Sequence, residues 1–309
     1  MDKNKLKQHV ETCIQRSGSA AEIARKCGIS ATALSQFRSG KYGAKDDSLA
    51  QTIATGLRYS ENDWVVVESV TSYRQIATTF HSAKEERLWM AISNKAGSGK
   101  TKTLEDLYLR SVDDSVVYIQ CREWSARQFL LELMEITIGK SKDKTYQTID
   151  ALLNTLIRYF NNKSTQKPIL LIDEADKLKP AALRTLIPLY NETEYRLGAI
   201  LAGTENLEKE IKRGVKAEKK GYDEIDSRLG RAFIHLLGAT QKQVKDICTA
   251  NGVTDETYQE QIWAEVEKEQ KQPDKYKDKL VLFTEDFRRL MRLIKTKRVE
   301  ERLRKEAQV

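Results

Sequence analysis

The spacing of apolar residues separates a helical amino-terminal part from a part in which helices alternate with short strands. Over residues 1–58, apolar side chains recur every three or four positions, and Gly or Ser separates the periodic segments. This pattern predicts four helices, over residues 5–17, 20–28, 31–40 and 48–57. Residues 58–70, RYSENDWVVVESV, interrupt the spacing with turn formers and a β-branched run. We therefore expect a first domain over residues 1–60.

From about residue 70, short apolar runs separate longer amphipathic segments. The runs predict strands over residues 87–93, 116–121, 168–173 and 198–203. The segments between them predict helices over residues 73–84, 125–138, 148–161 and 181–192, and one more after a glycine-containing loop at 94–101. Strands that alternate with helices are typical of a parallel sheet covered on both faces. The sequence therefore predicts an α/β domain over residues 61–240.

The carboxy-terminal residues 241–309 show helical spacing and many charges. We expect them to form a separate, purely helical lid. Residues 208–224, EKEIKRGVKAEKKGYDE, come nearest to a charge-rich flexible segment. We expect this segment to be flexible.

Composition narrows the class of protein. The 309 residues carry a formal net charge of +8 at pH 7, and a basic surface attracts polyanions such as nucleic acid. Cys13, Cys27, Cys121 and Cys248 lack C-x-x-C spacing, which indicates buried thiols rather than a zinc site or a disulfide framework. No apolar run approaches the length of a membrane span and the amino terminus lacks an apolar signal segment. We therefore expect a cytoplasmic protein with no membrane partner.

Residues 94–101, NKAGSGKT, match the phosphate-binding loop G-x-x-x-x-G-K-[ST] except at its first position. Asn94 replaces that glycine, and because Asn tolerates positive φ well, we expect the turn to form with Asn94 in that conformation. Loop N–H groups would face the phosphates of ATP, Lys100 would reach the terminal phosphates and Thr101 would bind Mg²⁺. The predicted nucleotide-binding residues are Asn94, Lys95, Ala96, Gly97, Ser98, Gly99, Lys100, Thr101 and Lys102.

A pair of carboxylates follows the apolar run of PILLIDEAD. Ligands of α/β sheets bind at the carboxyl ends of the strands, where Asp173 and Glu174 are expected. Asp173 would complete the Mg²⁺ site with Thr101, and Glu174 would orient and deprotonate the attacking water. Lys100 and Glu174 are therefore the first predicted catalytic residues.

These two motifs resemble those of the AAA+ ATPase superfamily, in which Asp-Glu follows the second motif's strand. The resemblance implies a polar sensor on the next strand, for which Thr204 in GAILAGTEN is the first choice and Asn206 the second. It also implies an arginine that reaches the neighbouring subunit's nucleotide, here Arg228 or Arg231. Finally, it implies a sensor arginine in the lid, here Arg288 or Arg289. Hydrolysis would then depend on assembly.

The segment AAEIARKCGISATALSQFRSGKY resembles a helix-turn-helix. The small Ala24 allows close helix crossing, Gly28 allows the turn, and the apolar residues between them form the inside. The inner residues are Ile23, Ile29, Leu34 and Phe37. The predicted DNA-contacting residues are Thr32, Gln36, Arg38 and Lys41. Contact with another protein remains open as an alternative for this unit.

An amino-terminal helix-turn-helix joined to a compact AAA+ module resembles the phage Mu B-like family of target-selecting transposition ATPases. The resemblance extends from the helix-turn-helix through NKAGSGKT, LLIDEAD and LAGTEN to DFRRLMRL. It implies ATP-dependent helical filaments on double-stranded DNA, with little sequence preference, and delivery of that DNA to a transposase. By this analogy the DNA-facing loops carry Arg122, Arg127, Lys140, Lys142 and Lys144. Asn94 and Thr204 depart from the family pattern.

Other functions fit the same motifs. One is a helicase loader, which shares the AAA+ core and would prefer single-stranded DNA. Another is a transcriptional regulator whose helix-turn-helix reads one operator while nucleotide switches its assembly. A structural adaptor with an inactive site is disfavoured by Lys100, Thr101, Asp173 and Glu174.

Overall fold

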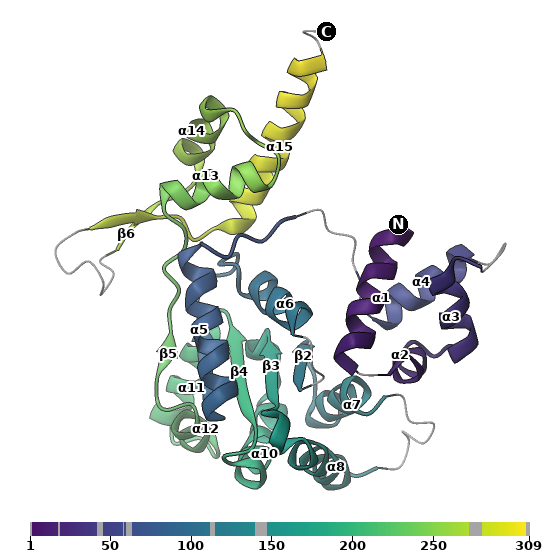
Figure 1. Ribbon diagram of the computed structural model, residues 1–309. Coiled ribbons are helices and arrows are strands. Elements are labelled where there is room, and N and C mark those ends of the chain that lie inside the picture. Colours follow the sequence, from purple (N-terminus) through teal and green to yellow (C-terminus); the bar gives the residue numbers. More distant parts are fainter. Residues whose placement is uncertain are drawn as a thin grey trace.

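The computed structural model describes residues 2–17, 19–41, 46–57, 59, 64–111, 115–139, 147–271 and 280–306. Figure 1 shows three groups of elements: helices α1–α4, a sheet with its flanking helices, and a carboxy-terminal group that ends in a long helix. Among the described residues, no helix is long and apolar enough to cross a membrane.

The amino-terminal group contains α1 (Lys3–Ser17), α2 (Ala20–Cys27), α3 (Ala31–Ser39) and α4 (Asp46–Gly56). The Ser19 and Ser30 side chains cap α2 and α3 by accepting hydrogen bonds from backbone N–H groups. Gly28 ends α2 at φ 70°, a value that favours glycine. Of the predicted inner residues, Ile23, Leu34 and Phe37 are buried and Ile29 packs against them. The four predicted helices are confirmed; the helix-turn-helix interpretation remains a prediction.

The central sheet has five parallel strands in the order β2-β3-β4-β1-β5. The strands are β1 (Trp89–Ser93), β2 (Val116–Gln120), β3 (Ile169–Asp173), β4 (Gly198–Gly203) and β5 (Phe233–Ile234). The parallel α/β prediction is confirmed, and β1–β4 lie within the predicted ranges. The sequence did not reveal β5, because two half-buried residues at a sheet edge are too few to show a period.

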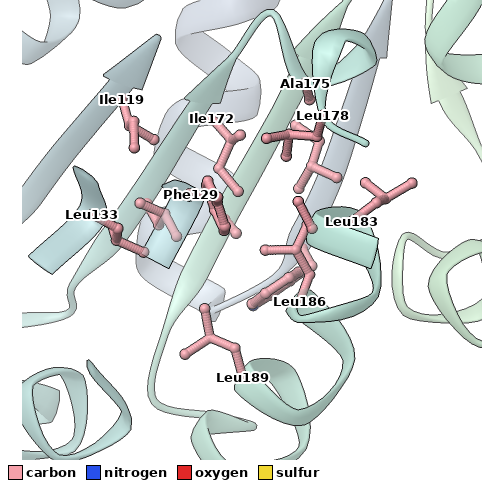
Figure 2. Packing of buried hydrophobic residues seen from close by; sticks show 14 of the residues in the cluster. Ile119, Phe129, Leu133, Ile172, Ala175, Leu178, Leu183, Leu186 and Leu189 are labelled. Atoms are coloured by element: carbon pink, nitrogen blue, oxygen red, sulfur yellow. The ribbon is translucent and has the colours of Figure 1, made fainter. Parts of the chain in front are cut away.

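Helices cover both faces of this sheet. Alternate residues of β3 and β4 point to opposite faces, and both sets are apolar and buried. One face carries α7 (Ala126–Thr137), α8 (Ile149–Asn162), α9 (Pro180–Arg184), α10 (Leu186–Thr193), α11 (Glu205–Lys216) and α12 (Tyr222–Arg228). Figure 2 shows Phe129 and Leu133 of α7, and Leu186 of α10, among the side chains that pack against Ile119 and Ile172 of the strands. The other face carries α5 (Thr71–Glu86) and α6 (Lys100–Arg110).

The prediction of a flexible segment at residues 208–224 is wrong, since α11 and α12 span most of it. Leu207 and Ile211 are buried on one side of α11. Gly214 lies against the Tyr222 ring, and a Cβ there would come within 2.3 Å of that ring. The charged side chains lie on the outer faces of the helices. The sequence shows many charges and only a narrow apolar stripe, so the helical pattern was missed.

The carboxy-terminal group contains α13 (Gln241–Ala250), α14 (Glu256–Glu265) and α15 (Phe287–Glu306). The prediction that it is purely helical is wrong, because β6 (Glu269–Lys271) and β7 (Val281–Phe283) form an antiparallel pair between α14 and α15. Each strand has three residues, and the charged β6 has no apolar alternation that would reveal it. Ion pairs join this pair of strands to neighbouring residues, Lys95 with Glu269 and Lys271 with Glu285. The domain limits at 60 and 240 remain predictions.

Candidate nucleotide-binding site

A cavity of about 340 Å³ lies at the carboxyl ends of β1, β3 and β4. It is lined by residues 96–103 and by polar side chains from the strand ends, namely Asp173, Glu174, Asp176 and Thr204. It is also lined by residues 64–67 and by Tyr73, Ile247, Phe287 and Met291. The lining thus combines a polar loop rich in backbone N–H groups with a set of mainly apolar residues. A nucleoside triphosphate likewise combines charged phosphates with a flat base.

The loop between β1 and α6 turns at two glycines. Gly97 and Gly99 have φ of 88° and 87°, which other residues adopt only with strain. The start of α15 lies directly against them: the Phe287 N–H donates to the Gly97 carbonyl oxygen at 2.9 Å. A Cβ at Gly97 would come within 2.9 Å of Asp286 Oδ1. The loop therefore depends on glycine both for its turn and for the close approach of α15.

The expectation of a positive φ at Asn94 is wrong, since Asn94 is not among the described non-glycine residues with positive φ. Its side chain has a different task. Asn94 is buried, its Oδ1 accepts from the Leu236 N–H at 3.2 Å, and its Nδ2 donates to Glu285 Oε2 at 3.4 Å. The Asn94 side-chain amide thus connects the end of β1 to Leu236, which follows β5, and to Glu285, which forms an ion pair with Lys271. A glycine could make neither contact.

Lys100 begins α6 and points back into the loop. Its Nζ donates to the carbonyl oxygens of Asn94 and Lys95 at 2.8 and 3.0 Å and to Ser98 Oγ at 2.9 Å. Burial lowers the pKa of Lys100 to about 8, although Asp173 and Asp176 act in the opposite direction. A partly dehydrated ammonium group is suited to bind a triphosphate, because the negatively charged phosphate oxygens would replace the hydrogen bonds to water that Lys100 has lost.

Asp173 and Thr101 lie within hydrogen-bond reach of each other across the cavity. The Tyr118 hydroxyl donates to Asp173 Oδ2 at 3.1 Å from the neighbouring strand, and the Glu174 N–H donates to Asp173 Oδ1 at 2.9 Å. Burial raises the pKa of Asp173, and the hydrogen bonds from Thr101 and Tyr118 oppose that rise. Among the described residues no group of three His, Cys, Asp or Glu side chains could hold a metal alone. A hydroxyl and one carboxylate fit Mg²⁺, which keeps waters and takes oxygens from substrate phosphates.

Glu174 follows β3 with φ 53°, a conformation that costs a non-glycine residue about 1–3 kcal/mol. Its carboxylate accepts from Lys177 Nζ at 2.6 Å. This ion pair holds the predicted water-activating group at the cavity wall. Glu174 must leave Lys177 before that carboxylate oxygen can accept a hydrogen bond from the attacking water.

Thr204 lines the cavity at the end of β4. Its hydroxyl donates to Asp176 Oδ2 at 2.6 Å and accepts from the Asn206 N–H at 3.3 Å, which caps α11. Asn206 itself is exposed and does not line the cavity. Of the two sensor alternatives, Thr204 is the one placed beside the nucleotide-binding loop.

The structure separates the predicted arginines. Arg288 lines the cavity and acts on the pKa of Lys100, whereas Arg289 lies outside it and pairs with Glu265 at 3.8 Å. Arg228 and Arg231 both lie outside the cavity of their own chain. Arg228 is occupied, donating to Asn191 Oδ1 at 2.6 Å and stacking over Tyr190 at 5.4 Å. Arg231 is more exposed and pairs with Asp223 at 2.8 Å.

The predicted DNA-contacting residues do not form one cluster in the described structure. Thr32, Gln36 and Lys41 are exposed on or after α3. Arg38 makes two hydrogen bonds to the Glu11 carboxylate, at 2.6 and 2.8 Å. Arg122 is exposed after β2, and Arg127 is half-buried at the start of α7. Lys140, Lys142 and Lys144 lie outside the described residues.

The sequence did not identify the apolar part of the cavity lining. The segment Trp64–Val67 was interpreted only as a domain boundary, and Phe287 and Met291 only as parts of a lid helix. The β-branched run VVV ahead of the first helix of the α/β domain was the one available signal. Tyr118 gave none, because a tyrosine in a strand is ordinary.

A family model described as an AAA domain matches residues 83–211. Among solved structures, the chain is similar to Cdc6p from Pyrobaculum aerophilum, with 14% identity, a TM-score of 0.44 and coverage of 62% of this chain and 52% of that chain. It is also similar to the structure of Drosophila ORC bound to DNA, with 16% identity, a TM-score of 0.45 and coverage of 79% and 59%. The chain therefore spans between half and three-fifths of these two structures. No curated protein matches it.

The strand order, the glycine loop and the AAA-domain match define a P-loop protein of AAA+ fold. Lys100, Thr101 and Asp173 lie at one cavity of this fold, so the site has the residues that would hold the phosphates and Mg²⁺ of a nucleotide.

Proposed function

We propose that this chain is an ATPase that binds double-stranded DNA with little sequence preference, assembles along it as an ATP-dependent helical filament, and delivers that DNA to a transposase. ATP would lie with its phosphates on residues 96–101 and its base against Trp64–Val67, and Mg²⁺ would be held by Thr101 and Asp173. Mg²⁺ would neutralise charge that develops on the phosphates. Glu174, Thr204 and Arg288 would orient the water and the terminal phosphate.

The position of Arg231 carries the proposal that ATP joins neighbouring copies. Its side chain is 54% exposed and lies outside its own chain's cavity. Arg231 could therefore reach only the cavity of an adjacent copy, where it would add a second guanidinium to that copy's own Arg288, and an arginine supplied in this way contributes on the order of 10³ to 10⁵ in rate. Assembly and hydrolysis would be coupled for this reason.

The charge of the chain supports the DNA part of the proposal. The net charge is +8, and Lys41 and Arg122 are exposed on different elements. Arg38 contributes less than its sequence position suggests, since it already binds Glu11. Contacts of this kind read phosphates rather than bases, which favours binding without sequence preference.

Electron microscopy of the chain with random-sequence duplex DNA, with and without ATP, tests this proposal. We expect continuous filaments with ATP and none without it. The log of the affinity should fall with the log of the salt concentration, with a slope of about −0.9 for each phosphate neutralised. Isolated particles with ATP, or affinity independent of salt, would rule the filament out.

The same material distinguishes the alternatives. Preference for single-stranded DNA would favour a helicase loader, and a footprint at one sequence would favour a transcriptional regulator. The transposase step is tested separately, by asking whether a transposase bound to its element ends inserts more often into filament-coated plasmid than into naked plasmid. Equal insertion would remove that step from the proposal.

A further inference from the structure

One face of α13 holds the segment that precedes α5. Gln243 and Ile247 lie along one side of the helix, and Asn251, four residues further on, is the residue that caps its carboxyl end. Gln243 Nε2 donates to the Ser69 carbonyl oxygen at 3.0 Å, and Gln243 Oε1 accepts from the Thr71 N–H at 3.3 Å. Ile247, between the two amides, lines the nucleotide cavity.

Asn251 holds the other end of the same segment. Its Oδ1 accepts from the Val65 N–H at 2.8 Å, and its Nδ2 donates to the Val65 carbonyl oxygen at 3.1 Å. Nδ2 also donates to the Ile247 carbonyl oxygen at 2.9 Å. Asn251 is 4% exposed. The backbone at Val65 belongs to no sheet. The Asn251 side-chain amide therefore supplies the donor and the acceptor that a neighbouring strand would supply in a sheet.

The held segment forms the apolar wall of the cavity. Trp64, Val65, Val66 and Val67 all line it, as does Lys100 of the phosphate-binding loop. Loss of the Asn251 contacts would free the Val65 backbone while leaving the phosphate-binding loop intact, because the loop is held by different contacts at Asn94 and Phe287.

We propose that Asn251 is a positioning residue for the base of the bound nucleotide, acting by holding the backbone of Val65 in the cavity wall. This inference rests on the proposed function, which places the phosphates on the loop and the base against Trp64–Val67. A flat base gains affinity from apolar contact with a cavity wall that is already ordered. If the wall is disordered before binding, the free energy needed to order it reduces the affinity. The phosphates gain nothing from this wall.

Calorimetry with Mg-ATP and with magnesium tripolyphosphate, which has no base, tests the inference. In Asn251→Ala we expect the affinity for ATP to fall roughly tenfold, since two hydrogen bonds that order the wall are lost, while the affinity for tripolyphosphate stays within about twofold. Val65→Pro removes the N–H that Asn251 Oδ1 accepts and leaves Asn251 in place, so it serves if the alanine variant does not fold. Asn161→Ala is the matched control, because Asn161 also donates its side-chain amide to a backbone oxygen, of Glu192, but away from the cavity.

The outcomes separate cleanly. Selective loss of ATP affinity supports the role of Asn251. Equal loss of both affinities would show a general structural role, and unchanged ATP affinity would show that the base does not use this wall; either result overturns the inference. Wild-type chain that binds neither ATP nor tripolyphosphate would overturn the proposed function itself.

Discussion

The Tyr118 hydroxyl donates a hydrogen bond of 3.1 Å to Asp173 Oδ2, so β2 holds the carboxylate that ends β3. The carboxylate is nearly fully buried. Few other groups can orient it once Thr101 turns toward a bound cation.

Tyr118→Phe should therefore raise the Mg²⁺ concentration for half-maximal ATP hydrolysis by roughly tenfold, because hydrogen bonds to charged groups contribute about 1.5–3 kcal/mol and water recovers part of the loss. Steady-state hydrolysis across a Mg²⁺ titration measures this shift. Tyr108→Phe removes a hydroxyl from a ring 5.7 Å away and serves as control. An unchanged Mg²⁺ dependence in Tyr118→Phe would contradict the role.

The pKa of Lys100, lowered by burial to about 8, predicts a pH dependence for ATP binding. Above pH 8 the free protein holds Lys100 neutral, whereas a bound triphosphate raises the pKa and restores the proton. Binding should then take up a proton, and affinity should fall by up to about tenfold for each pH unit above 8. Calorimetry at pH 8.5 in buffers of different ionisation enthalpy measures the uptake. Proton release, or none, would show that Lys100 stays charged in the free protein.

Asn94→Gly restores the usual loop glycine, yet we expect it to lower stability rather than to raise activity. The substitution removes the contacts to Leu236 and Glu285, and two buried hydrogen bonds are together worth about 1–3 kcal/mol of unfolding free energy. Chemical denaturation measures this loss. The exposed Asn206→Ala should change the unfolding free energy little. A glycine variant as stable as the wild type would mean that the Asn94 amide is dispensable.

Lys177→Ala should raise basal ATP hydrolysis about two- to fivefold, since the ion pair that holds Glu174 is partly exposed and worth at most about 1 kcal/mol. The freed carboxylate becomes available to the attacking water. Hydrolysis without DNA is the measurement, and Lys179→Ala, which lies outside the cavity, is the control. Slower hydrolysis in Lys177→Ala would mean that Lys177 itself assists the reaction.

Arg231→Ala and Arg228→Ala should fail in different ways. Arg231→Ala should lower turnover by on the order of 10³ while nucleotide binding and stability change little. Arg228→Ala should instead destabilise the fold, because Arg228 binds Asn191 and stacks over Tyr190. Single-turnover hydrolysis, nucleotide titration and thermal unfolding together distinguish the two. Normal turnover in Arg231→Ala would exclude it as the residue supplied to a neighbour.

The parts of the fold that the sequence predicted correctly are those with a local signal. β1 to β4 are apolar runs of five or six residues between helical patterns, and the phosphate-binding loop and Asp173 lie within a few residues of such runs. All four cysteines are buried, as their spacing indicated.

The parts that escaped prediction depend on partners distant in the chain. Asn94 and Glu285 are 191 residues apart, and Val65 and Asn251 are 186 apart. No periodicity or motif links such positions. Asn94 was interpreted from the conformational preference of asparagine alone, whereas its side-chain contacts determine its role. β6 was missed for a related reason, since Glu269 and Lys271 pair with Lys95 and Glu285 and no apolar alternation marks the strand.

The contact of Phe287 with the carbonyl oxygen of Gly97 has a consequence for synthesis on the ribosome. The loop and the residue that seats upon it are separated by most of the α/β domain and the helices that follow. A growing polypeptide that has emerged only as far as β5 would contain the glycine loop but not Phe287, which contacts that loop in the complete fold. Retention of ATP should thus begin late in translation, once α15 has left the exit tunnel.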